Sequence, residues 1–156
     1  MKVCVVMGSK SDMEIAKKCI SVLKEFGVDY EVYVASAHRT PQKVVEIANS
    51  DADVFICIAG MSAALPGVLA SHTLKPVIGV PVSGKINLDA ILSMVQMPPG
   101  IPVATVALDG GKNAALLAMR ILAIKYPEIE VKLKEYIEAM REDVEKDSED
   151  VRSVLL

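Results

Sequence analysis

The feature that most constrains this chain is the alternation of short apolar runs with segments of helical period. These segments follow one another at residues 3–7, 14–26, 30–34, 41–48 and 54–58. The helical segments are amphipathic, as in the first one, where Ile15, Cys19 and Leu23 share a face and Gly27 follows the end. Such alternation is typical of an α/β fold, in which crossover helices join the strands of a parallel sheet.

The second half continues the pattern less regularly. We expect a helix that begins near Pro66, because a missing N–H costs nothing in a first helical turn. Two further strands at residues 77–82 and 101–108 and two closing helices at 113–124 and from 128 to about 144 complete the prediction. The last helix has an apolar seam that could cover its own domain or a neighbouring subunit.

The composition indicates one globular domain. With 156 residues, 52% of them apolar, the chain is long enough for one substantial core. We therefore expect residues 1–156 to form a single catalytic domain, with residues 145–156 as a charged tail able to fray. The net charge of −3 and the dispersed Lys and Arg residues argue against nucleic-acid binding.

We also expect a cytoplasmic protein that does not bind membranes. The first strand begins at residue 2, which leaves no room for a leader, and no apolar run approaches the roughly 18 residues of a membrane span. Cys4, Cys19 and Cys57 fall at apolar positions far apart in the sequence, so we expect buried free thiols. The pattern offers no metal site, since the cysteines are unpaired.

Three loops that follow the first three predicted strands carry the candidate chemistry, because ligands of parallel sheets bind beyond the carboxyl ends of the strands. The first loop, Gly8-Ser9-Lys10-Ser11-Asp12, has free N–H groups and hydroxyls at a helix start, which suit a phosphate or a hydroxyl-rich group. The alternative is that Ser11 or Asp12 only caps the helix. The loop matches neither the Walker pattern nor a dinucleotide fingerprint.

The second loop is Ser36-Ala37-His38-Arg39-Thr40-Pro41. A cap from Thr40 and a helix start at Pro41 would satisfy folding, but folding alone has no use for His38 beside Arg39. Arg39 could bind a phosphate with its forked donors, and His38 could transfer protons near neutral pH. We interpret this loop as the active site of an enzyme acting on a small phosphorylated metabolite.

The third loop, residues 59–67, is small and mostly apolar. It could form a dry wall with its backbone at Gly60 and Ser62 close to a ligand, or it could be a packing turn that needs only Gly60 and Gly67. Other polar positions are weaker candidates. His72 has the position of a surface or C-terminal capping residue, and Asn113 that of a helix cap. The proline-rich loop at 96–102 could support the site or a subunit contact.

Four motifs together resemble one family. They are M-G-S-K-S-D at residues 7–12, S-A-H-R-T-P at 36–41, A-L-P-G at 64–67 and Q-M-P-P-G-I-P-V-A-T at 96–105. The chain resembles the catalytic-subunit family of purine biosynthesis that carboxylates aminoimidazole ribonucleotide. The resemblance spans residue 2 to about residue 125, with the motifs in the family's order, which a shared fold alone would not produce.

This resemblance implies a flavodoxin-like three-layer α/β/α sandwich, assembled as a homo-octamer, that needs no metal or organic cofactor. His38 matches the catalytic histidine, and the family positions that hold the phosphate and ribose are matched by Ser9, Ser11, Asp12, Ser36 and Arg39. In the mutase branch, carbon dioxide leaves the exocyclic nitrogen of N5-carboxyaminoimidazole ribonucleotide and is added to ring carbon C4. His38 would protonate the nitrogen and later remove the C4 proton.

The third loop departs from the family pattern. Mutases usually carry A-H-L-P-G there, and this chain has Ala64 in place of the histidine. The branch that carboxylates aminoimidazole ribonucleotide directly typically shows A-G-R-S-N in that loop and H-K in the second loop. Residues 59–62, A-G-M-S, partly resemble that branch, while His38, Arg39 and the run at 96–105 agree with the mutases. The mutase is the first hypothesis and the direct carboxylase its alternative.

Two alternatives belong to other classes of protein. One is a non-catalytic module that binds a phosphoribosyl compound, in which His38 only donates a hydrogen bond. The other is a structural oligomer, which leaves both polar loops unexplained.

Overall fold

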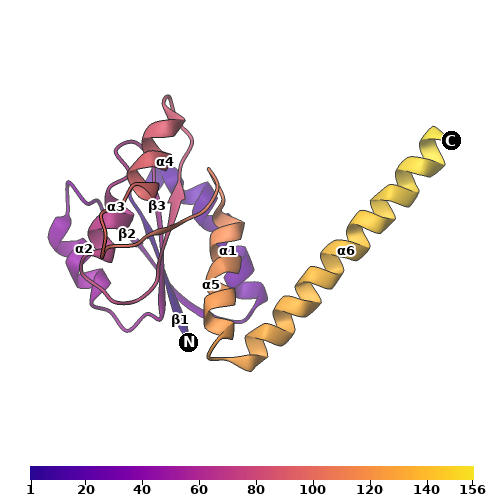
Figure 1. Cartoon of the computed structure of the whole chain (residues 1–156), viewed down its shortest axis with the longest axis horizontal. Coiled ribbons are helices and arrows are strands. Elements are labelled where there is room, and N and C mark those ends of the chain that lie inside the picture. The colour runs from indigo at the N-terminus through magenta and orange to yellow at the C-terminus, as the bar shows by residue number, and fades with distance from the viewer. The chain divides into compact units, whose positions relative to one another are not determined.

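The computed structural model describes residues 1–156, which divide into two compact units, Met1–Ala118 and Met119–Leu156. The first unit contains a five-stranded parallel sheet in the order β2-β1-β3-β4-β5 (Figure 1). The strands are β1 (Lys2–Met7), β2 (Asp29–Val34), β3 (Val54–Ala59), β4 (Val77–Pro81) and β5 (Ala104–Thr105). This strand order confirms the predicted flavodoxin-like arrangement.

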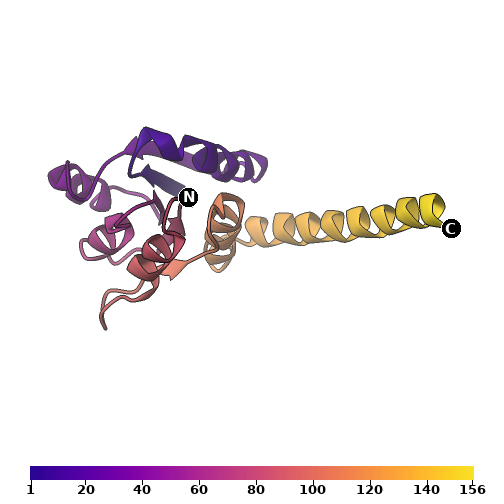
Figure 2. The same cartoon turned by 90° about the horizontal axis from the view of Figure 1, so that it is seen from above.

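Helices connect and cover these strands. They are α1 (Met13–Glu25), preceded by the short 3-10 turn Lys10–Asp12, then α2 (Pro41–Ala48), α3 (Leu65–Ala70), α4 (Asn87–Val95), α5 (Gly111–Ala123) and α6 (Pro127–Leu155). Within the first unit the sheet lies between helical layers (Figure 2). The predicted three-layer sandwich is therefore confirmed.

Alternation along the central strands supplies both layers with apolar side chains. Cys4 and Val6 of β1 belong to a buried cluster that includes Val44 of α2, Leu69 of α3 and Met94 of α4. The neighbouring Val3 and Val5 are equally buried but point to the opposite face, because successive strand residues alternate. The buried residues of α1 serve that other layer, so the central strands read as continuous apolar runs.

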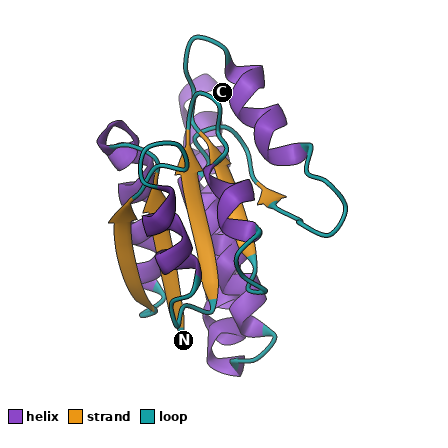
Figure 3. Ribbon diagram, turned by 90° about the vertical axis from the view of Figure 1, so that its left-hand side faces the viewer, coloured by secondary structure: helices purple, strands orange, loops and turns teal.

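The structure differs from the prediction at the fifth strand and at α4. The fifth strand was predicted over residues 101–108 and pairs only at Ala104–Thr105, beside β4 (Figure 3). Its neighbour Pro102 has no N–H for a ladder, so the apolar run on either side continues as loop. Helix α4 was not predicted, although Leu88, Leu92 and Val95 are spaced as on a helix face.

The last two helices also have different limits. Helix α5 begins at Gly111, so Asn113 is an exposed residue of its first turn and does not cap it, contrary to the prediction. In the second unit, α6 continues past the predicted end near residue 144 to Leu155. Of its apolar seam, Ile129 and Leu133 are buried, whereas Met140 and Val144 are exposed. No helix combines the length and apolar character of a membrane span.

The cysteines are free and buried, as predicted. Cys4 and Cys57 lie on adjacent strands, and Cys19 lies in α1. Burial is the main cause that raises the pKa of the Cys4 and Cys19 thiols to about 12, and it also raises the pKa of Cys57. Such thiols stay protonated and behave as small apolar side chains.

Candidate active site

The strand register brings the three candidate loops together at the carboxyl ends of the strands. Met7, the last residue of β1, pairs with Val34 on one side and with Ile58 on the other. The next residues extend both ladders, because Gly8 N–H donates to Ile58 O at 2.9 Å and Ala35 N–H donates to Met7 O at 2.9 Å. The loops after β1, β2 and β3 therefore start at the same level, where the chain direction across the sheet reverses.

The first loop is folded around the Asp12 carboxylate. Its Oδ2 accepts from Ser9 N–H at 3.0 Å, and its Oδ1 accepts from the Ser11 hydroxyl at 3.0 Å. Ser9 is the N-cap of the short 3-10 turn, and its hydroxyl accepts from Ser11 N–H at 3.3 Å. Asp12 is therefore the N-cap residue of α1 by position, as one of the alternatives predicted, but its carboxylate makes no capping bond to that helix. The hydroxyl that caps is that of Ser9, at the preceding 3-10 turn.

Asp12 is the one charged residue that is buried, with 5% of its surface exposed. Burial raises the pKa of its carboxyl above the ordinary value, although the hydrogen bonds from Ser11 and Ser9 oppose that change. A buried carboxylate is costly unless it is hydrogen-bonded, and these two donors meet that need. The price of burying Asp12 suggests a task beyond capping, since an exposed carboxylate caps equally well.

The second loop closes on itself through Ser36 and Thr40. Ser36 N–H donates to Thr40 Oγ1 at 2.9 Å, and Thr40 N–H donates to Ser36 O at 2.9 Å. Thr40 is the N-cap residue of α2, with Pro41 in the first turn, but its hydroxyl makes no capping bond to the helix. The predicted Thr40 cap is therefore present by position, while its side chain organises the loop.

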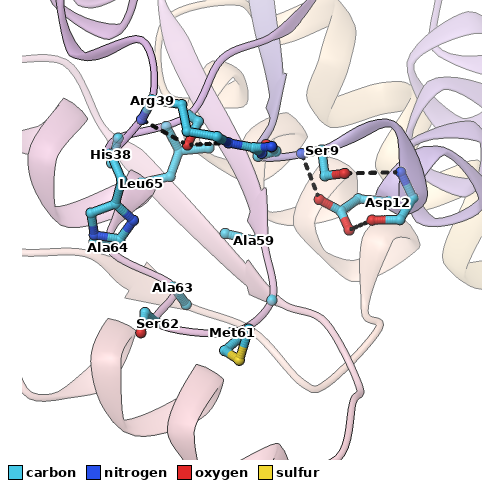
Figure 4. A pocket seen from close by; sticks show the side chains of 15 residues that line it. Ser9, Asp12, His38, Arg39, Ala59, Met61, Ser62, Ala63, Ala64 and Leu65 are labelled. Atoms are coloured by element: carbon cyan, nitrogen blue, oxygen red, sulfur yellow. Dashed lines mark hydrogen bonds between the residues drawn. The ribbon is translucent and has the colours of Figure 1, made fainter.

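Arg39 joins the second loop to the first. Its Nε donates to Ser36 Oγ at 3.3 Å, and its Nη2 donates to Gly8 O at 3.1 Å. These bonds use two of the five N–H groups of the guanidinium and leave three for an anion. Figure 4 shows the Arg39 side chain extended between the two loops, with Ser9 and Asp12 beyond it.

His38 contrasts with the bonded residues around it. Its exposed imidazole makes no hydrogen bond within the chain, and in Figure 4 it projects toward Ala64 of the third loop. A buried structural histidine would use at least one ring nitrogen on a protein partner, whereas the exposed ring of His38 is open to solvent. Both nitrogens of His38 are free for a ligand.

The third loop has an apolar surface and a strained backbone. Ala63 is buried and Met61 is 93% exposed, while Ser62 has a φ of 54° in the left-handed region. Ala63 N–H donates to Gly60 O at 2.9 Å, and Ser62 N–H donates to Asp89 Oδ2 of α4 at 2.7 Å. Pro66 lies in the first turn of α3, as predicted.

The glycines of the cavity loops serve two different purposes, close packing and space for a ligand. A methyl group at Gly67 would lie 2.9 Å from Met97 Cε, so Gly67 serves packing. At Gly60 it would meet only Val82 Cβ at 3.7 Å, and at Gly8 its contacts would begin at 3.7 Å. Folding does not require the space at Gly8 and Gly60, so that space is available to a ligand.

Together the loops enclose a cavity of about 480 Å³. Every predicted site residue lines it: Ser9, Ser11, Asp12, Ser36, His38, Arg39, Gly60 and Ser62. The remaining wall is small or apolar and was not predicted to bind the substrate, although Ala64 was noted as a departure from the family pattern; it consists of Gly8, Ala37, Ala59, Met61, Ala63, Ala64 and Leu65. The cavity is of the size that holds one small ligand.

Other polar positions lie apart from this cavity. His72 is exposed just after α3, in agreement with a surface role. The loop at 96–102 packs through Met97 near Gly67 of α3, so it supports the element that follows the third loop. No group of three or more His, Cys, Asp or Glu side chains is arranged to hold a metal ion.

Sequence comparison decides the family. The AIR carboxylase family matches residues 2–143. The chain belongs to this family. Its Methanocaldococcus jannaschii relative, named N5-carboxyaminoimidazole ribonucleotide mutase, is 60% identical over 154 residues, covering 97% of this chain and 98% of the relative. A Pyrococcus abyssi protein of the same name is 56% identical, covering 90% of this chain and 84% of the relative.

A solved structure agrees with this membership in the family. The crystal structure of Treponema denticola PurE has a TM-score of 0.86 and 36% sequence identity, covering 96% of this chain and 97% of that chain. The AIR carboxylase fold therefore extends over almost the whole chain.

Proposed function

We propose that this chain converts N5-carboxyaminoimidazole ribonucleotide to 4-carboxy-5-aminoimidazole ribonucleotide in de novo purine biosynthesis. The proposal rests on one observation. The His38 imidazole makes no hydrogen bond and lies in a cavity whose other side carries hydrogen-bond donors suited to a phosphate, including Arg39. The names of the archaeal relatives support the same reaction. The chain would thus act as a mutase, an isomerase of a small phosphorylated metabolite.

His38 acts as both acid and base in this proposal. As the N–CO₂ bond breaks, its imidazolium gives a proton to the exocyclic nitrogen, and aminoimidazole ribonucleotide and carbon dioxide form. Ring carbon C4 then attacks the carbon dioxide, and neutral His38 takes the C4 proton, which restores the aromatic ring. The second transfer returns the enzyme to its starting state, so one group suffices.

The first two loops hold the ribose phosphate. Arg39 offers its three unused N–H groups to the phosphate, and Ser9, Ser11 and Ser36 offer hydroxyls beside it. The Asp12 carboxylate lines the same cavity and accepts from a ribose hydroxyl. Anchoring the non-reacting end fixes the ring near His38, which converts binding energy into orientation.

The third loop retains carbon dioxide between the two steps. Gly60 and Ser62 bring backbone close to the ligand, and Ala63 and Ala64 present methyl groups to the cavity. Carbon dioxide has no charged group to anchor it, so a water-excluding wall must keep it near C4. This task gives the apolar character of the loop a chemical purpose.

Direct carboxylation of aminoimidazole ribonucleotide by free carbon dioxide is the alternative. Ala64 favours it, because mutases usually carry a second histidine there and His38 is the one imidazole that lines this cavity. The two reactions share the second half, from attack by C4 to removal of its proton. They differ only in the source of the carbon dioxide.

The wider biological setting is proposed along with the reaction. We place the protein in the cytoplasm, as a homo-oligomer and specifically an octamer, with one catalytic domain per chain and no metal or organic cofactor. All the lining residues belong to the first compact unit, Met1–Ala118. The chemistry needs only proton transfer and a confined carbon dioxide, which the described residues supply.

Separate assays with the two starting materials test the proposal. Purified protein should convert N5-carboxyaminoimidazole ribonucleotide with little incorporation of ¹³C from labelled bicarbonate. Ready use of aminoimidazole ribonucleotide at modest bicarbonate, with full labelling of the product, would instead support the direct carboxylase. Failure to turn over either compound, combined with tight binding of both, would support the non-catalytic binding module.

A further inference from the structure

The backbone of the third loop is held in an unfavourable conformation. Ser62 and Asp109 are the two residues other than glycine with positive φ, at 54° and 56°. Aspartate is among the residues that tolerate the left-handed region, whereas serine enters it less readily. A contact from outside the loop can therefore add to the turn bond from Ala63 N–H to Gly60 O in stabilising the conformation of Ser62.

Asp89 provides that contact. Ser62 N–H donates to Asp89 Oδ2 at 2.7 Å, across 27 positions of sequence. This distance is at the short end for an amide that donates to a carboxylate, where the charge strengthens the bond. Asp89 lies in the first turn of α4, outside the residues that line the cavity.

The helix that carries Asp89 is fixed to the sheet. The next residue, Ala90, is 2% exposed, and Met94 is fully buried in the cluster beneath α4. Contact with β4 is close, because a methyl group at Gly79 would lie 2.9 Å from Met94 Sδ. The backbone of α4 at Asp89 is thus fixed relative to the core, and the half-buried Asp89 carboxylate links the third loop to it through a solvent-exposed hydrogen bond.

We propose that Asp89 is a positioning residue that holds the third loop over the reacting end of the cavity, so that carbon dioxide stays there between its release and recapture. This inference rests on the proposed function. Asp89 acts through Ser62 and touches no reacting atom. The adjacent Met61, Ala63 and Ala64 line the cavity, so freeing Ser62 opens the wall that they form.

The proposal separates two kinetic effects. The residues assigned to the phosphate and ribose lie on the other two loops, which have their own hydrogen bonds, so loss of Asp89 should leave KM nearly unchanged. The fate of carbon dioxide should change instead. More of it should escape, more aminoimidazole ribonucleotide should be released, and more ¹³C from bicarbonate should enter the product.

The experiment compares the full-length wild-type chain with three variants at position 89. Asp89→Ala removes the acceptor. Asp89→Glu moves the carboxylate by one methylene and keeps the negative charge that is favourable in a first helical turn. Asp89→Asn keeps an acceptor oxygen. Asp109→Gly is the matched control, since Asp109 Oδ1 accepts from Ser83 N–H at 2.9 Å outside the cavity and glycine tolerates the positive φ. Labelling, free aminoimidazole ribonucleotide, KM and kcat are measured with N5-carboxyaminoimidazole ribonucleotide and ¹³C-bicarbonate.

We expect Asp89→Ala and Asp89→Glu to raise label incorporation by at least about fivefold, as for loss of a charge-assisted hydrogen bond, with KM unchanged within about twofold. Asp89→Asn keeps an acceptor oxygen but loses the charge, so its label incorporation should lie between those variants and the wild type, and Asp109→Gly should label as the wild type does. Amide exchange over residues 60–64, followed by mass spectrometry, should accelerate most in Asp89→Ala and Asp89→Glu and should not change in Asp109→Gly. This second readout does not depend on turnover.

The outcomes keep the two proposals apart. Wild-type protein that does not convert N5-carboxyaminoimidazole ribonucleotide would overturn the proposed function. If the wild-type protein is active, wild-type labelling in both Asp89→Ala and Asp89→Glu would overturn the role of Asp89. Should Asp89→Ala not fold, the result for Asp89→Glu decides by itself.

Discussion

The two sides of the cavity are held in place by opposite means. On the polar side, the first and second loops are cross-linked to themselves and to each other through Asp12, Thr40 and Arg39. On the apolar side, the third loop has a turn at Gly60 and one bond to the core-anchored Asp89. One side is a preorganised set of polar groups, to which we assign the phosphate, and the other is a wall of small residues with few hydrogen bonds.

This difference matches the demands of the proposed chemistry. A ribose phosphate offers charges and hydroxyls, so many fixed donors can bind it with little reorganisation. Carbon dioxide offers no such handle, so a wall has to retain it by shape and by exclusion of water. We therefore expect changes on the polar side to act on binding, changes on the apolar side to act on the fate of the carboxylate, and His38 to act on the rate.

The largest effect should come from the group between the two sides. His38→Asn removes the proton donor and acceptor but keeps a polar side chain of similar reach, so kcat should fall by about 10²- to 10⁴-fold. Binding of the phosphorylated ligand should persist, because the other residues assigned to it remain. Steady-state kinetics and calorimetric titration with aminoimidazole ribonucleotide measure both quantities. Comparable activity in the variant would overturn the assignment of His38 as the acid and base.

The next largest effect should be on the polar side. Arg39→Ala removes the hydrogen bond to Gly8 O and the guanidinium to which we assign the phosphate. The affinity for the phosphorylated substrate should therefore fall by about 10- to 100-fold. Arg39→Lys is the matched control, which keeps the charge but not the forked geometry, and should lose less. Titration with the ribonucleotide and with its unphosphorylated nucleoside checks the assignment. An equal loss for both ligands would count against phosphate binding.

A pair of glycine substitutions compares the two sides directly. Added methyl groups at Gly8 and Gly60 would have ordinary contacts of 3.7 Å or more, so the free energy of unfolding should change by less than about 0.5 kcal/mol. Gly8→Ala should raise KM by about tenfold through crowding of the anchored end. Gly60→Ala should instead change mainly the fraction of carbon dioxide that escapes before it is recaptured. Denaturant unfolding and the labelling assay test both variants.

The control for these substitutions is Gly111→Ala. A methyl group there would collide with the backbone carbonyl of Ile15 in α1, which should cost about 1 to 3 kcal/mol in unfolding free energy. Equal destabilisation by all three substitutions would show that the cavity glycines also serve packing.

The smallest effect concerns stability and pH. Burial raises the pKa of Asp12 in the folded chain above the value of 3.8 that applies when it is exposed. The folded state therefore binds more protons between these two values, and the contribution of Asp12 is present at low pH and is lost as the pH rises through the raised pKa. The unfolding free energy of the wild type minus that of Asp12→Asn should fall as the pH increases from about 4. Urea unfolding across this range measures the difference, and a constant or rising difference would contradict the assignment.

Much of the fold and the site could be predicted from local patterns. The apolar runs of β1 and β3 and the amphipathic face of α1 carry their periods in consecutive residues, so their limits agree closely with the structure. The second loop was recognised because a helix start did not account for His38 beside Arg39, although Arg39 proves also to join the first and second loops. Failures occurred where local signals were weak, as at the two-residue strand β5 and at α4, whose apolar spacing went unread.

Sequence by itself identified the side chains to which we assign the chemistry: the polar loops at Ser9–Asp12 and Ser36–Thr40, and the apolar loop that departs from the family at Ala64. Only the tertiary structure decided that Arg39 donates to Gly8 O, 31 positions away in the sequence, and that Ser62 N–H donates to Asp89, 27 positions away. The physical reason is that periodicity and turn chemistry act between near neighbours. Contacts between distant residues follow from the strand order and register, which place the ends of β1, β2 and β3 at one level.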